Sequence, residues 1–366
     1  MIPVRGHVRL YEQARTAHLE RERAGTPTTL LYTHKRYDFD EGLAATLDVR
    51  QVGTFGALRL LWLSDVRVLE VTEPAFLAGA PRAAACLFAL RVRHALRLGR
   101  RPTVVSYAIG NSDPRSEYQP RSFRERTTFR GKWWCGHLVM RWTDRLAFGT
   151  PDAVTTYDRL FGRPRGQERT MILALPTRCL CGEVRPRTGS VVFVGAFVAR
   201  KGVPQLLEAW PAVAALVDGA TLTLVGKGEI LDDVTALARR TVGVVVVVDP
   251  PRSQIHDVLR EASVLVLPSQ PSPTWREQVG LPIVEALQHG CTVVTTDETG
   301  LASWLREHGH RVIPATSGAA VLAEAIADAA THPVPPDEVL AALPAQGGRA
   351  QAHAWMFDRS DADGLG

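Results

Sequence analysis

The stretch "SVLVLPSQPSPTWREQVGLPIVEALQHGCTVVTTD", Ser263–Asp297, is decisive for the fold. The apolar run over 263–267 predicts a buried strand, a polar loop follows, 281–290 has the pattern of a helix, and 291–297 predicts a second strand. Short Val-rich runs without alternation are typical of parallel strands buried on both faces. We therefore predict a strand–loop–helix–strand unit of a doubly wound α/β sheet.

The same alternation of predicted strands and helices extends back to residue 190. Strands are predicted over 190–197, 220–226 and 242–249, and helices over 203–217, 229–240 and 253–262. The loops "VGAFVARKG", "VGKGE" and "PSQPSPTWREQVGLP" follow three of the strands. Ligands of open α/β sheets bind outside the carboxyl ends of the strands. We expect the three loops to open on one crevice.

The first half of the chain shows a noisier α/β pattern. Strands are expected over 28–34, 46–52, 66–72, 103–110 and 152–158, and helices over His7–Arg23, Arg82–Leu98 and Arg121–Phe148. The opening lacks a hydrophobic first strand, so we expect a chain that starts late or a sheet that is one strand short. The predicted organisation is an α/β domain over 1–178, a Pro-containing linker over 179–188, a second α/β domain over 189–345, and a tail over 346–366 that packs back or is loosely ordered.

Composition and charge describe a globular chain with two unlike halves. Of the 366 residues, 45% are apolar and 22% are charged, and no apolar run approaches the ~20 residues of a membrane-spanning helix. We expect a cytoplasmic protein, because the start also lacks the apolar region of a signal peptide. Residues 1–187 hold 31 Lys and Arg against 18 Asp and Glu, a net +13, whereas residues 188–366 hold 12 against 20, a net −8.

The five cysteines are scattered and odd in number, which argues against a disulfide framework. Cys179-Leu-Cys181 resembles one half of a metal-binding motif, but no second Cys or His pair lies at ligand spacing. We therefore expect reduced thiols and no metal.

Two glutamates flank a predicted anion-binding helix start. Gly280 permits close backbone approach, and Pro282 suits the first helical position. The free N–H groups there and the helix dipole attract phosphate. Glu285, near the first turn, can accept two hydrogen bonds from a ribose diol, and Glu277 can do so from a second sugar. This pattern is typical of a site for a sugar nucleotide.

The lysines favour the same interpretation. The chain has four lysines against 39 arginines, and two of the four, Lys201 and Lys227, occupy the glycine-bearing loops. A compact ammonium beside a diphosphate explains both positions, although a solvated turn lysine is the plainer alternative.

Together, "FVGAFVARKG", "LTLVGKGE", "ASVLVLPS" and "EQVGLPIVEALQHGCTVVTTDETGL" resemble the nucleotide-sugar domain of glycosyltransferase family 4. The resemblance covers about a third of the chain well, and the first half is similar only in its α/β rhythm. It implies a GT-B fold, in which two Rossmann-like domains face each other across a cleft, and a retaining mechanism. It also implies a nucleoside-diphosphate-sugar as co-substrate, with no further cofactor and no metal in the site.

The resemblance also implies roles for individual residues. Glu285 would bind the ribose, Glu277 the donor-sugar hydroxyls, and Lys201 the diphosphate. The remaining donor-site positions are Gly195, Lys227 and the backbone amides of Val279, Gly280 and Leu281. The family usually has an arginine where this chain has Ala196, and Arg200 is the candidate substitute.

The first half would bind the acceptor, and its residues are harder to assign. Asn111 and Asp113, in the loop after the strand that ends near Tyr107, are the candidates. The family's first-domain histidine has three candidates, His7, His34 and His137. The +13 charge predicts an anionic or lipid-linked acceptor, or peripheral contact with the inner membrane face, rather than nucleic acid.

The sequence therefore favours a retaining, hexosyltransferase-type glycosyltransferase in glycan, glycolipid or glycosylated natural-product synthesis. A glycoside hydrolase would use Glu277 and Glu285 as acid and base, but a phosphate-binding helix start between them argues against it. A sugar-nucleotide epimerase and a catalytically inactive donor-binding partner subunit stay open, because fold and active site are separable.

Overall fold

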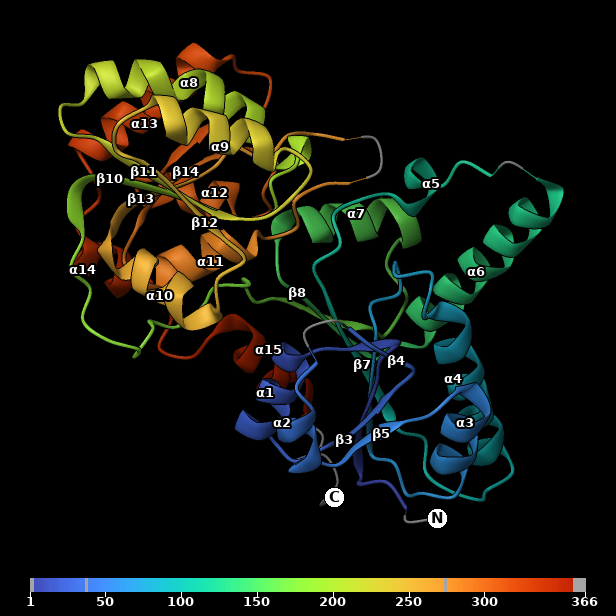
Figure 1. Cartoon of the computed structure of the whole chain (residues 1–366). Coiled ribbons are helices and arrows are strands. Elements are labelled where there is room, and N and C mark those ends of the chain that lie inside the picture. The colour runs from blue at the N-terminus through green and yellow to red at the C-terminus, as the bar shows by residue number, and fades with distance from the viewer. Residues whose placement is uncertain (1–2, 37–38, 121, 273–274, 358–366) are drawn as a thin grey trace. The chain divides into compact units, whose positions relative to one another are not determined.

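The computed structural model describes residues 3–36, 39–120, 122–272 and 275–357, and the chain divides into two compact units (Figure 1). The first falls within Met1–Leu173 and Arg349–Gly366, and the second within Ala174–Gly348. Each unit is built around its own parallel β-sheet.

The second unit has a six-stranded sheet in the order β12-β11-β10-β13-β14-β15, and every pair in it is parallel. Figure 1 shows α8, α9 and α13 on one side of this sheet and α10 and α11 on the other. The strands are β10 (Arg187–Val194), β11 (Thr221–Gly226), β12 (Val244–Val248), β13 (Ala262–Leu267), β14 (Thr292–Thr296) and β15 (Arg311–Ile313). The helices are α8 (Val203–Leu216), α9 (Leu231–Arg240), α10 (Arg252–Glu261), α11 (Leu281–Gln288), α12 (Ala302–Glu307), α13 (Ala319–Thr331) and α14 (Pro336–Ala341).

The predicted strands of this unit are confirmed, and burial explains why they could be predicted. All residues of β13 and β14 are buried, as expected of central strands covered by helices on both faces. The edge strand β12 is equally rich in valine, yet Val245 and Val248 are exposed. The apolar run therefore indicates a strand at both places but does not distinguish centre from edge.

The first unit has a seven-stranded parallel sheet in the order β5-β3-β1-β6-β7-β8-β9 and a separate two-stranded sheet, β2-β4. The strands are β1 (His7–Leu10), β2 (Gln13–Ala14), β3 (Thr29–Tyr32), β4 (His34–Lys35), β5 (Val49–Gln51), β6 (Val68–Val71), β7 (Thr103–Ala108), β8 (Arg145–Phe148) and β9 (Glu168–Met171). The helices are α1 (Thr16–Ala24), α2 (Glu41–Ala45), α3 (Thr54–Trp62), α4 (Ala80–Ala95), α5 (Pro114–Glu117), α6 (Phe123–Trp142), α7 (Pro151–Phe161) and α15 (Gly348–Phe357).

The start of the chain corrects two expectations. Residues 7–10 form β1, a central strand, so the helix predicted from His7 is wrong and the hydrophobic first strand is present. Arg9 interrupts the apolar run, but its side chain is buried and paired with Glu22 and Glu70. A buried ion pair allows a charged residue inside a sheet, which the hydrophobic pattern alone does not anticipate.

Two further predictions in the first half are wrong. The strand predicted over 152–158 is part of α7, which begins with a Thr150 cap and Pro151 and buries Ala153, Thr156, Tyr157 and Leu160. These buried residues recur every three to four positions, as on one face of a helix. The β-branched Val and Thr residues of this segment had favoured a strand instead. The helix predicted over 121–148 ends at Trp142, and β8 follows immediately; Arg121 lies outside the described residues.

The chain returns to the first unit at its C-terminal helix, α15. Ala352, Met356 and Phe357 are fully buried in one apolar cluster with Val68, Val105 and Ala147 of strands β6, β7 and β8. The helix therefore completes the core on one face of the first sheet.

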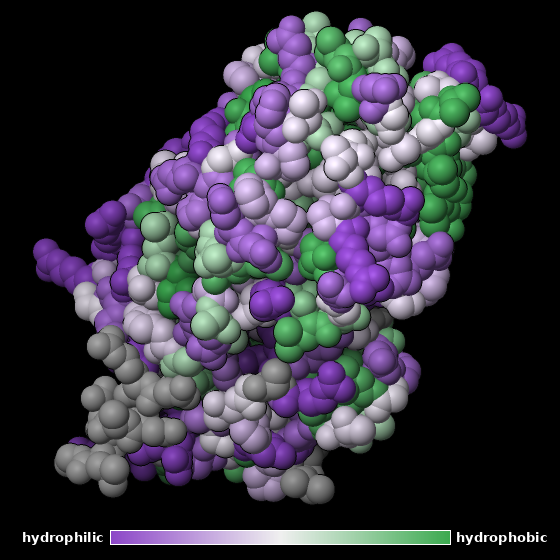
Figure 2. All heavy atoms as spheres, turned by 90° about the vertical axis from the view of Figure 1, so that its left-hand side faces the viewer, coloured by the Kyte–Doolittle hydropathy of each residue, from purple (hydrophilic) through white to green (hydrophobic). Residues whose placement is uncertain are grey.

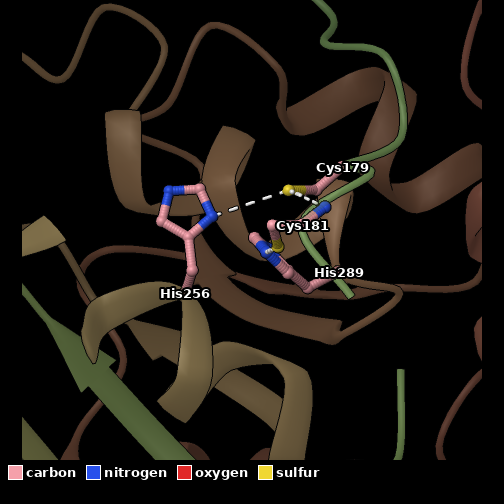
Figure 3. A group of neighbouring side chains, drawn as sticks. All are labelled: Cys179, Cys181, His256 and His289. Carbon is pink, nitrogen blue, oxygen red and sulfur yellow. Dashed lines mark hydrogen bonds between the residues drawn. The ribbon is translucent and has the colours of Figure 1, made fainter. Parts of the chain in front are cut away.

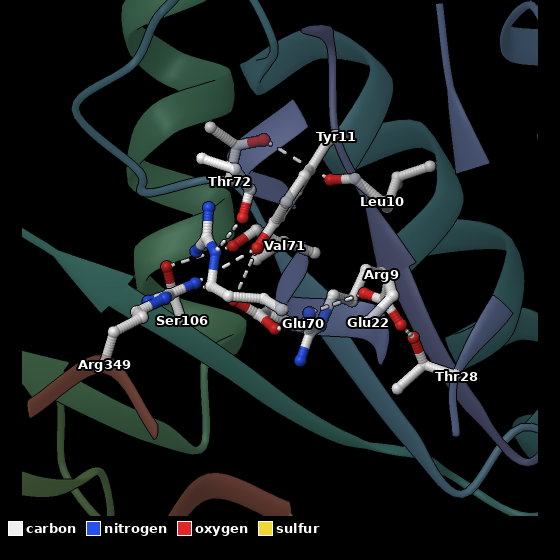
Figure 4. Close-up of polar contacts among 12 residues, drawn as sticks. Arg9, Leu10, Tyr11, Glu22, Thr28, Glu70, Val71, Thr72, Ser106 and Arg349 are labelled. Carbon is white, nitrogen blue, oxygen red and sulfur yellow. Dashed lines mark hydrogen bonds and ion pairs between the residues drawn. The ribbon is translucent and has the colours of Figure 1, made fainter. Parts of the chain in front are cut away.

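A buried polar network also connects α15 to this sheet (Figure 4). Arg349 donates to Glu70 at 2.5 Å and to the Tyr11 hydroxyl at 3.0 Å, and its guanidinium lies 4.2 Å from the centre of the Tyr107 ring. Arg9 lies 2.9 Å from the other Glu70 oxygen. Burial by itself would raise the pKa of Glu70, but Arg349 and Arg9 lower it to about 2. Glu70 is therefore an ionised, doubly paired carboxylate inside the unit.

Hydrophilic and hydrophobic residues are interspersed on the face shown in Figure 2. Among the described residues, no helix is both long and apolar enough to cross a bilayer.

Candidate functional site

The loops that leave β10, β11 and β13 meet at the carboxyl edge of the second sheet. Gly202 has φ 75°, and a Cβ there would lie 1.9 Å from the carbonyl oxygen of Pro268. A Cβ on Gly226 would lie 1.8 Å from the carbonyl oxygen of Gly195. The Gln270 N–H donates to the Arg200 carbonyl at 2.9 Å. Glycine is thus required where the backbones of neighbouring loops touch.

Lys201 and Glu277 form an ion pair at this edge. Lys201 is in the short 3₁₀ turn η1 (Ala199–Lys201) after β10, and Glu277 follows β13. The two side chains are only 13% and 10% exposed, and the Ser269 hydroxyl donates to the same Glu277 oxygen at 3.2 Å. The structure therefore brings together two residues that were predicted to bind the diphosphate and the donor sugar.

Trp275 lies beside both cations of the β10 loop. The Arg200 guanidinium is 4.4 Å and the Lys201 ammonium 4.9 Å from the centre of its ring. The indole holds the two positive groups near each other by cation–π attraction. Ala196, where a family arginine was expected, and Arg200 are both exposed, and the role of Arg200 as a substitute stays a prediction.

Glu285 is in α11 and has a different partner. Its side chain is 11% exposed, and its carboxylate lies 3.8 Å from the guanidinium of Arg252 at the start of α10. Burial raises the pKa of Glu285, and Arg252 acts in the opposite direction. The two glutamates thus form ion pairs with different cations on different elements, which suits contacts with two separate groups of a ligand.

The segment that enters α11 has the predicted open backbone. Gly280 precedes the helix with φ 83° and ψ 91°, Pro282 is buried in its first turn, and Leu281 is 62% exposed. The Thr299 hydroxyl donates to the Val279 carbonyl at 2.8 Å. This contact holds the carbonyl of Val279 at the start of α11, the kind of helix end at which an anion is stabilised.

Lys227, in the loop after β11, lies farther into solvent. It pairs with Asp249 at 2.6 Å, and the two side chains are 66% and 63% exposed. An exposed pair of this kind contributes little by itself, so Lys227 is the weakest of the predicted cationic contacts.

In the first unit, Asn111 and Asp113 lie in the loop after β7, but they differ in role. Asn111 is buried, and its carbonyl accepts from Thr156 at 3.3 Å. Asp113 caps α5 by accepting from the Arg115 N–H at 2.9 Å and also pairs with the Arg115 guanidinium. Both contacts are structural, and neither tests an acceptor role.

Glu73 is a carboxylate that holds the loop after β7, and sequence reasoning did not single it out. It accepts from the N–H groups of Ile109 and Gly110 at 3.1 and 2.9 Å and from the Tyr157 hydroxyl at 3.1 Å. Burial raises the pKa of Glu73, whereas these hydrogen bonds lower it. Glu73 fixes the loop that carries Asn111, and its place two residues after the buried strand β6 was the available signal.

The three candidate histidines occupy unlike places. His7 begins β1, at the opposite end of the strand from a carboxyl-edge site, and contacts Phe357. His34 is 67% exposed and lies 3.9 Å from Glu12. His137 is in α6, where it packs against Trp133 and Phe161. His34 lies just past the carboxyl end of β3, and His137 lies beside Gly136, which packs against the Pro74 carbonyl just after β6, so two of the three are near that edge of the sheet.

The cysteine pair in the second unit has partners that the sequence analysis did not find. His256 of α10 and His289 at the end of α11 lie beside Cys179 and Cys181 (Figure 3). No histidine pair lies at ligand spacing along the sequence, yet the fold brings two histidines beside these cysteines. Spacing rules recognise ligands that are close in sequence, whereas these histidines lie 77 and 108 residues from the cysteines that they contact.

Comparison with known proteins agrees with this geometry. Residues 188–332 match the family model described as "Glycosyl transferases group 1". The teichuronic acid biosynthesis protein TuaC of Bacillus subtilis, named as a putative glycosyltransferase, is 33% identical over 150 residues, which is 39% of this chain and 35% of TuaC. The chain thus spans about a third of the length of this curated relative.

Solved structures resemble the whole chain. The lipopolysaccharide outer core galactosyltransferase WaaB superposes with a TM-score of 0.65 at 9% identity, over 98% of this chain and 100% of WaaB. HepE of Anabaena in complex with UDP superposes with a TM-score of 0.64 at 12% identity, over 98% and 99% of the two chains. The same protein in complex with UDP-glucose gives 0.59. At these identities the likeness concerns the fold alone, and it confirms the predicted GT-B fold with two Rossmann-like domains.

Proposed function

We propose that this chain is a retaining glycosyltransferase that moves a sugar from a nucleoside-diphosphate-sugar to an acceptor hydroxyl. The observation that carries the proposal is the Lys201–Glu277 pair at the carboxyl edge of the second sheet, beside the backbone that enters α11. Residues 188–332, which contain this edge, match a glycosyltransferase family model.

Donor recognition divides among three groups of the second unit. Glu285 accepts hydrogen bonds from the ribose diol, and the amides of 279–281 with the α11 dipole face the phosphates. Lys201 meets the diphosphate and thereby frees Glu277 for the hydroxyls of the sugar. Because Lys201 already contacts Glu277 without a ligand, binding exchanges one partner for another rather than exposing a buried charge.

The chain's own residues would act in transfer by positioning and charge stabilisation. Negative charge grows on the leaving phosphate as the sugar departs, and Lys201, Arg200 and the α11 amides are placed at the edge where it would develop. The acceptor attacks on the same face, and the leaving phosphate oxygen takes its proton. No protein nucleophile and no metal is required.

A thermal-shift panel tests donor binding. UDP and UDP-glucose come first, because HepE is described in complex with each, followed by the corresponding guanosine and adenosine compounds. A donor that binds the folded chain raises its melting temperature by mass action. No shift with any nucleotide would overturn the proposal.

Product analysis then separates the alternatives. A glycosyltransferase releases nucleoside diphosphate faster when an acceptor is added, and an epimerase returns an altered sugar nucleotide. A hydrolase cleaves a glycoside without any nucleotide. Binding without turnover for every donor and acceptor tried would favour the inactive partner subunit.

The acceptor is proposed to be anionic or carried on an anionic lipid, bound by the basic first unit. Helix α6 is basic over its exposed first half, Phe123 and Trp134 are 80% and 63% exposed, and Trp133 stacks on Phe129 and Phe161. Each basic residue near an anionic membrane surface contributes about 1 kcal/mol, screened by salt. Sedimentation with phosphatidylglycerol and phosphatidylcholine vesicles at low and high salt tests the membrane version. Fast transfer to a neutral soluble acceptor would contradict it.

A further inference from the structure

A group of four metal-ligating side chains lies in the second unit, and the proposed transfer reaction does not use it. Cys179 and Cys181 come from the segment before β10, His256 from α10, and His289 from the end of α11 (Figure 3). Their four ligand atoms all lie within 4.8 Å of one another. Four soft and borderline ligands converging from three segments are typical of a structural metal site.

Two sulfur–nitrogen distances suit tetrahedral zinc. The Cys179 Sγ lies 3.6 Å from His256 Nδ1, and the Cys181 Sγ lies 3.3 Å from His289 Nε2. Zinc bonds of about 2.3 Å to sulfur and about 2.0 Å to nitrogen at a tetrahedral angle place sulfur and nitrogen about 3.5 Å apart. A thiol–imidazole hydrogen bond could explain either contact alone, but it does not explain why two such pairs share one centre.

The groups around the four ligands are those that a zinc site needs. His289 Nδ1 lies 2.6 Å from the Glu285 carbonyl, which only accepts, so Nδ1 carries the proton and Nε2 is free to ligate. The Cys181 N–H donates to the Cys179 sulfur at 3.3 Å, and Arg260 donates to the Cys181 sulfur at 3.4 Å. Both sulfurs therefore accept hydrogen bonds, as thiolates do.

We propose that Cys179, Cys181, His256 and His289 bind one zinc ion that has a structural role. Two thiolates and two neutral imidazoles balance the charge of the ion, and with four protein ligands no position is left for substrate or water. The ion would fasten the segment at 179–181, which has no regular structure, to α10 and α11. This site is separate from the transfer chemistry, so it is compatible with a metal-independent reaction.

The proposed zinc site lies next to the pair formed by Glu285 of α11 and Arg252 of α10. Glu285 lies one helical turn before His289, and its partner Arg252 lies one turn before His256. Metal binding would therefore fix both helices on which the Glu285–Arg252 pair stands. The zinc proposal does not depend on that pair having a function.

Metal content tests the proposal directly. The chain is expressed with zinc in the medium and with an affinity tag that contains no histidine, and zinc is measured by mass spectrometry against protein concentration. We expect about one equivalent per wild-type chain, falling below about 0.2 in Cys181→Ser and in His256→Ala. Cys135→Ser and His332→Ala are the matched controls, because Cys135 belongs to the first unit and His332 pairs with Asp328 on the surface, and both should retain the metal.

Two measurements on the wild-type chain keep the test independent of variant folding. Cobalt substituted for zinc should give the visible absorption of a tetrahedral ion and a thiolate charge-transfer band in the near ultraviolet. A chelator should lower the melting temperature of the wild-type chain but not that of a folded Cys181→Ser variant. A wild-type chain that binds neither zinc nor cobalt, or full metal content in both ligand variants, would overturn the proposal.

Discussion

The ion pairs of the two units differ in where they lie and in what they can contact. In the second unit, Lys201 and Glu277 lie at the carboxyl edge of the sheet and remain partly accessible. In the first unit, Arg9 and Glu70 are 3% and 1% exposed and pair inside the fold, and Arg349, which is 26% exposed, reaches Glu70 from α15. A charged pair at a loop edge is thus available to a ligand, whereas a buried carboxylate under a helix serves to position that helix.

The largest expected effect is on stability, in the first unit. Arg349→Ala leaves Glu70 buried with one partner fewer, and breaking a buried pair of this kind costs about 3–5 kcal/mol. We expect the urea midpoint to fall accordingly. The pKa of Glu70 is lowered to about 2, so this contribution is present above the ordinary value of 4.5 and is lost as the pH falls toward 2.

Arg163→Ala is the control for this prediction. Arg163 also pairs with an aspartate of the first unit, Asp158 at 2.7 Å, but its side chain is 72% exposed. The midpoint should hardly change, because water and salt screen such a pair. Equal losses in the two variants would remove the distinction between the buried and the exposed pair.

The second prediction moves from stability to turnover. Lys201→Ala should lower kcat about 100- to 1000-fold, because it removes a cation from the place where leaving-group charge develops. Arg200→Ala should also lower kcat strongly if Arg200 replaces the arginine missing at position 196. Steady-state rates with saturating donor measure both.

Lys35→Ala is the control for Lys201, since Lys35 belongs to the first unit and pairs with Glu41. It should not change kcat by more than about threefold, in keeping with the small effect of surface charges. A Lys201→Ala rate equal to that of Lys35→Ala would refute the proposed role, and a harmless Arg200→Ala would leave the substitution without support.

The third prediction separates the two glutamates. Glu285→Gln should weaken donor binding about 10- to 100-fold, the usual loss for a hydrogen bond to a charged group, whereas Glu277→Gln should mainly lower kcat. Calorimetric titration with nucleoside diphosphate measures the first effect. Equal loss of kcat in both variants, with nucleotide binding unchanged, would favour a hydrolase-like acid–base pair instead.

The pH dependence of binding sharpens this test. Burial raises the pKa of Glu285 above its ordinary 4.5, so acid should weaken donor binding earlier than for an exposed glutamate. A raised pKa also means that the protonated form of Glu285 favours folding, whereas the ionised carboxylate opposes it. The favourable contribution is therefore present below the ordinary pKa and is lost as the pH rises through the pKa of the folded state. Glu285→Gln should thus bind donor with little pH dependence and be at least as stable as wild type at pH 7.

The same comparison explains what the sequence could predict. The second unit follows a repeated pattern of apolar strand, glycine-bearing loop and amphipathic helix, so its strands β10–β14 and the approach of Lys201 to Glu277 could be anticipated from order along the chain. In the first unit, β1 depends on a buried Arg9 whose partners are Glu22 and Glu70. No local pattern reports such partners.

Long-range pairing limits prediction in the same way elsewhere. The Glu70–Arg349 contact joins residues 279 positions apart, and the Cys181–His289 contact joins residues 108 positions apart. Periodicity and motif spacing describe neighbours along the chain, whereas these contacts exist only once the helices have docked. The sequence could therefore single out residues such as Cys181, but it could not predict which residue each one contacts.

The smallest expected effect concerns Lys227, which was predicted to bind donor on the same sequence grounds as Lys201. The structure places it in an exposed pair with Asp249, so Lys227→Ala should weaken donor binding by no more than about threefold and leave kcat unchanged. Titration at low and high salt checks this, because the residual effect of an exposed cation should vanish as salt screens it. A loss above about tenfold that persists at high salt would mean that Lys227 leaves Asp249 for a desolvated phosphate, and the distinction between the two loop lysines would fail.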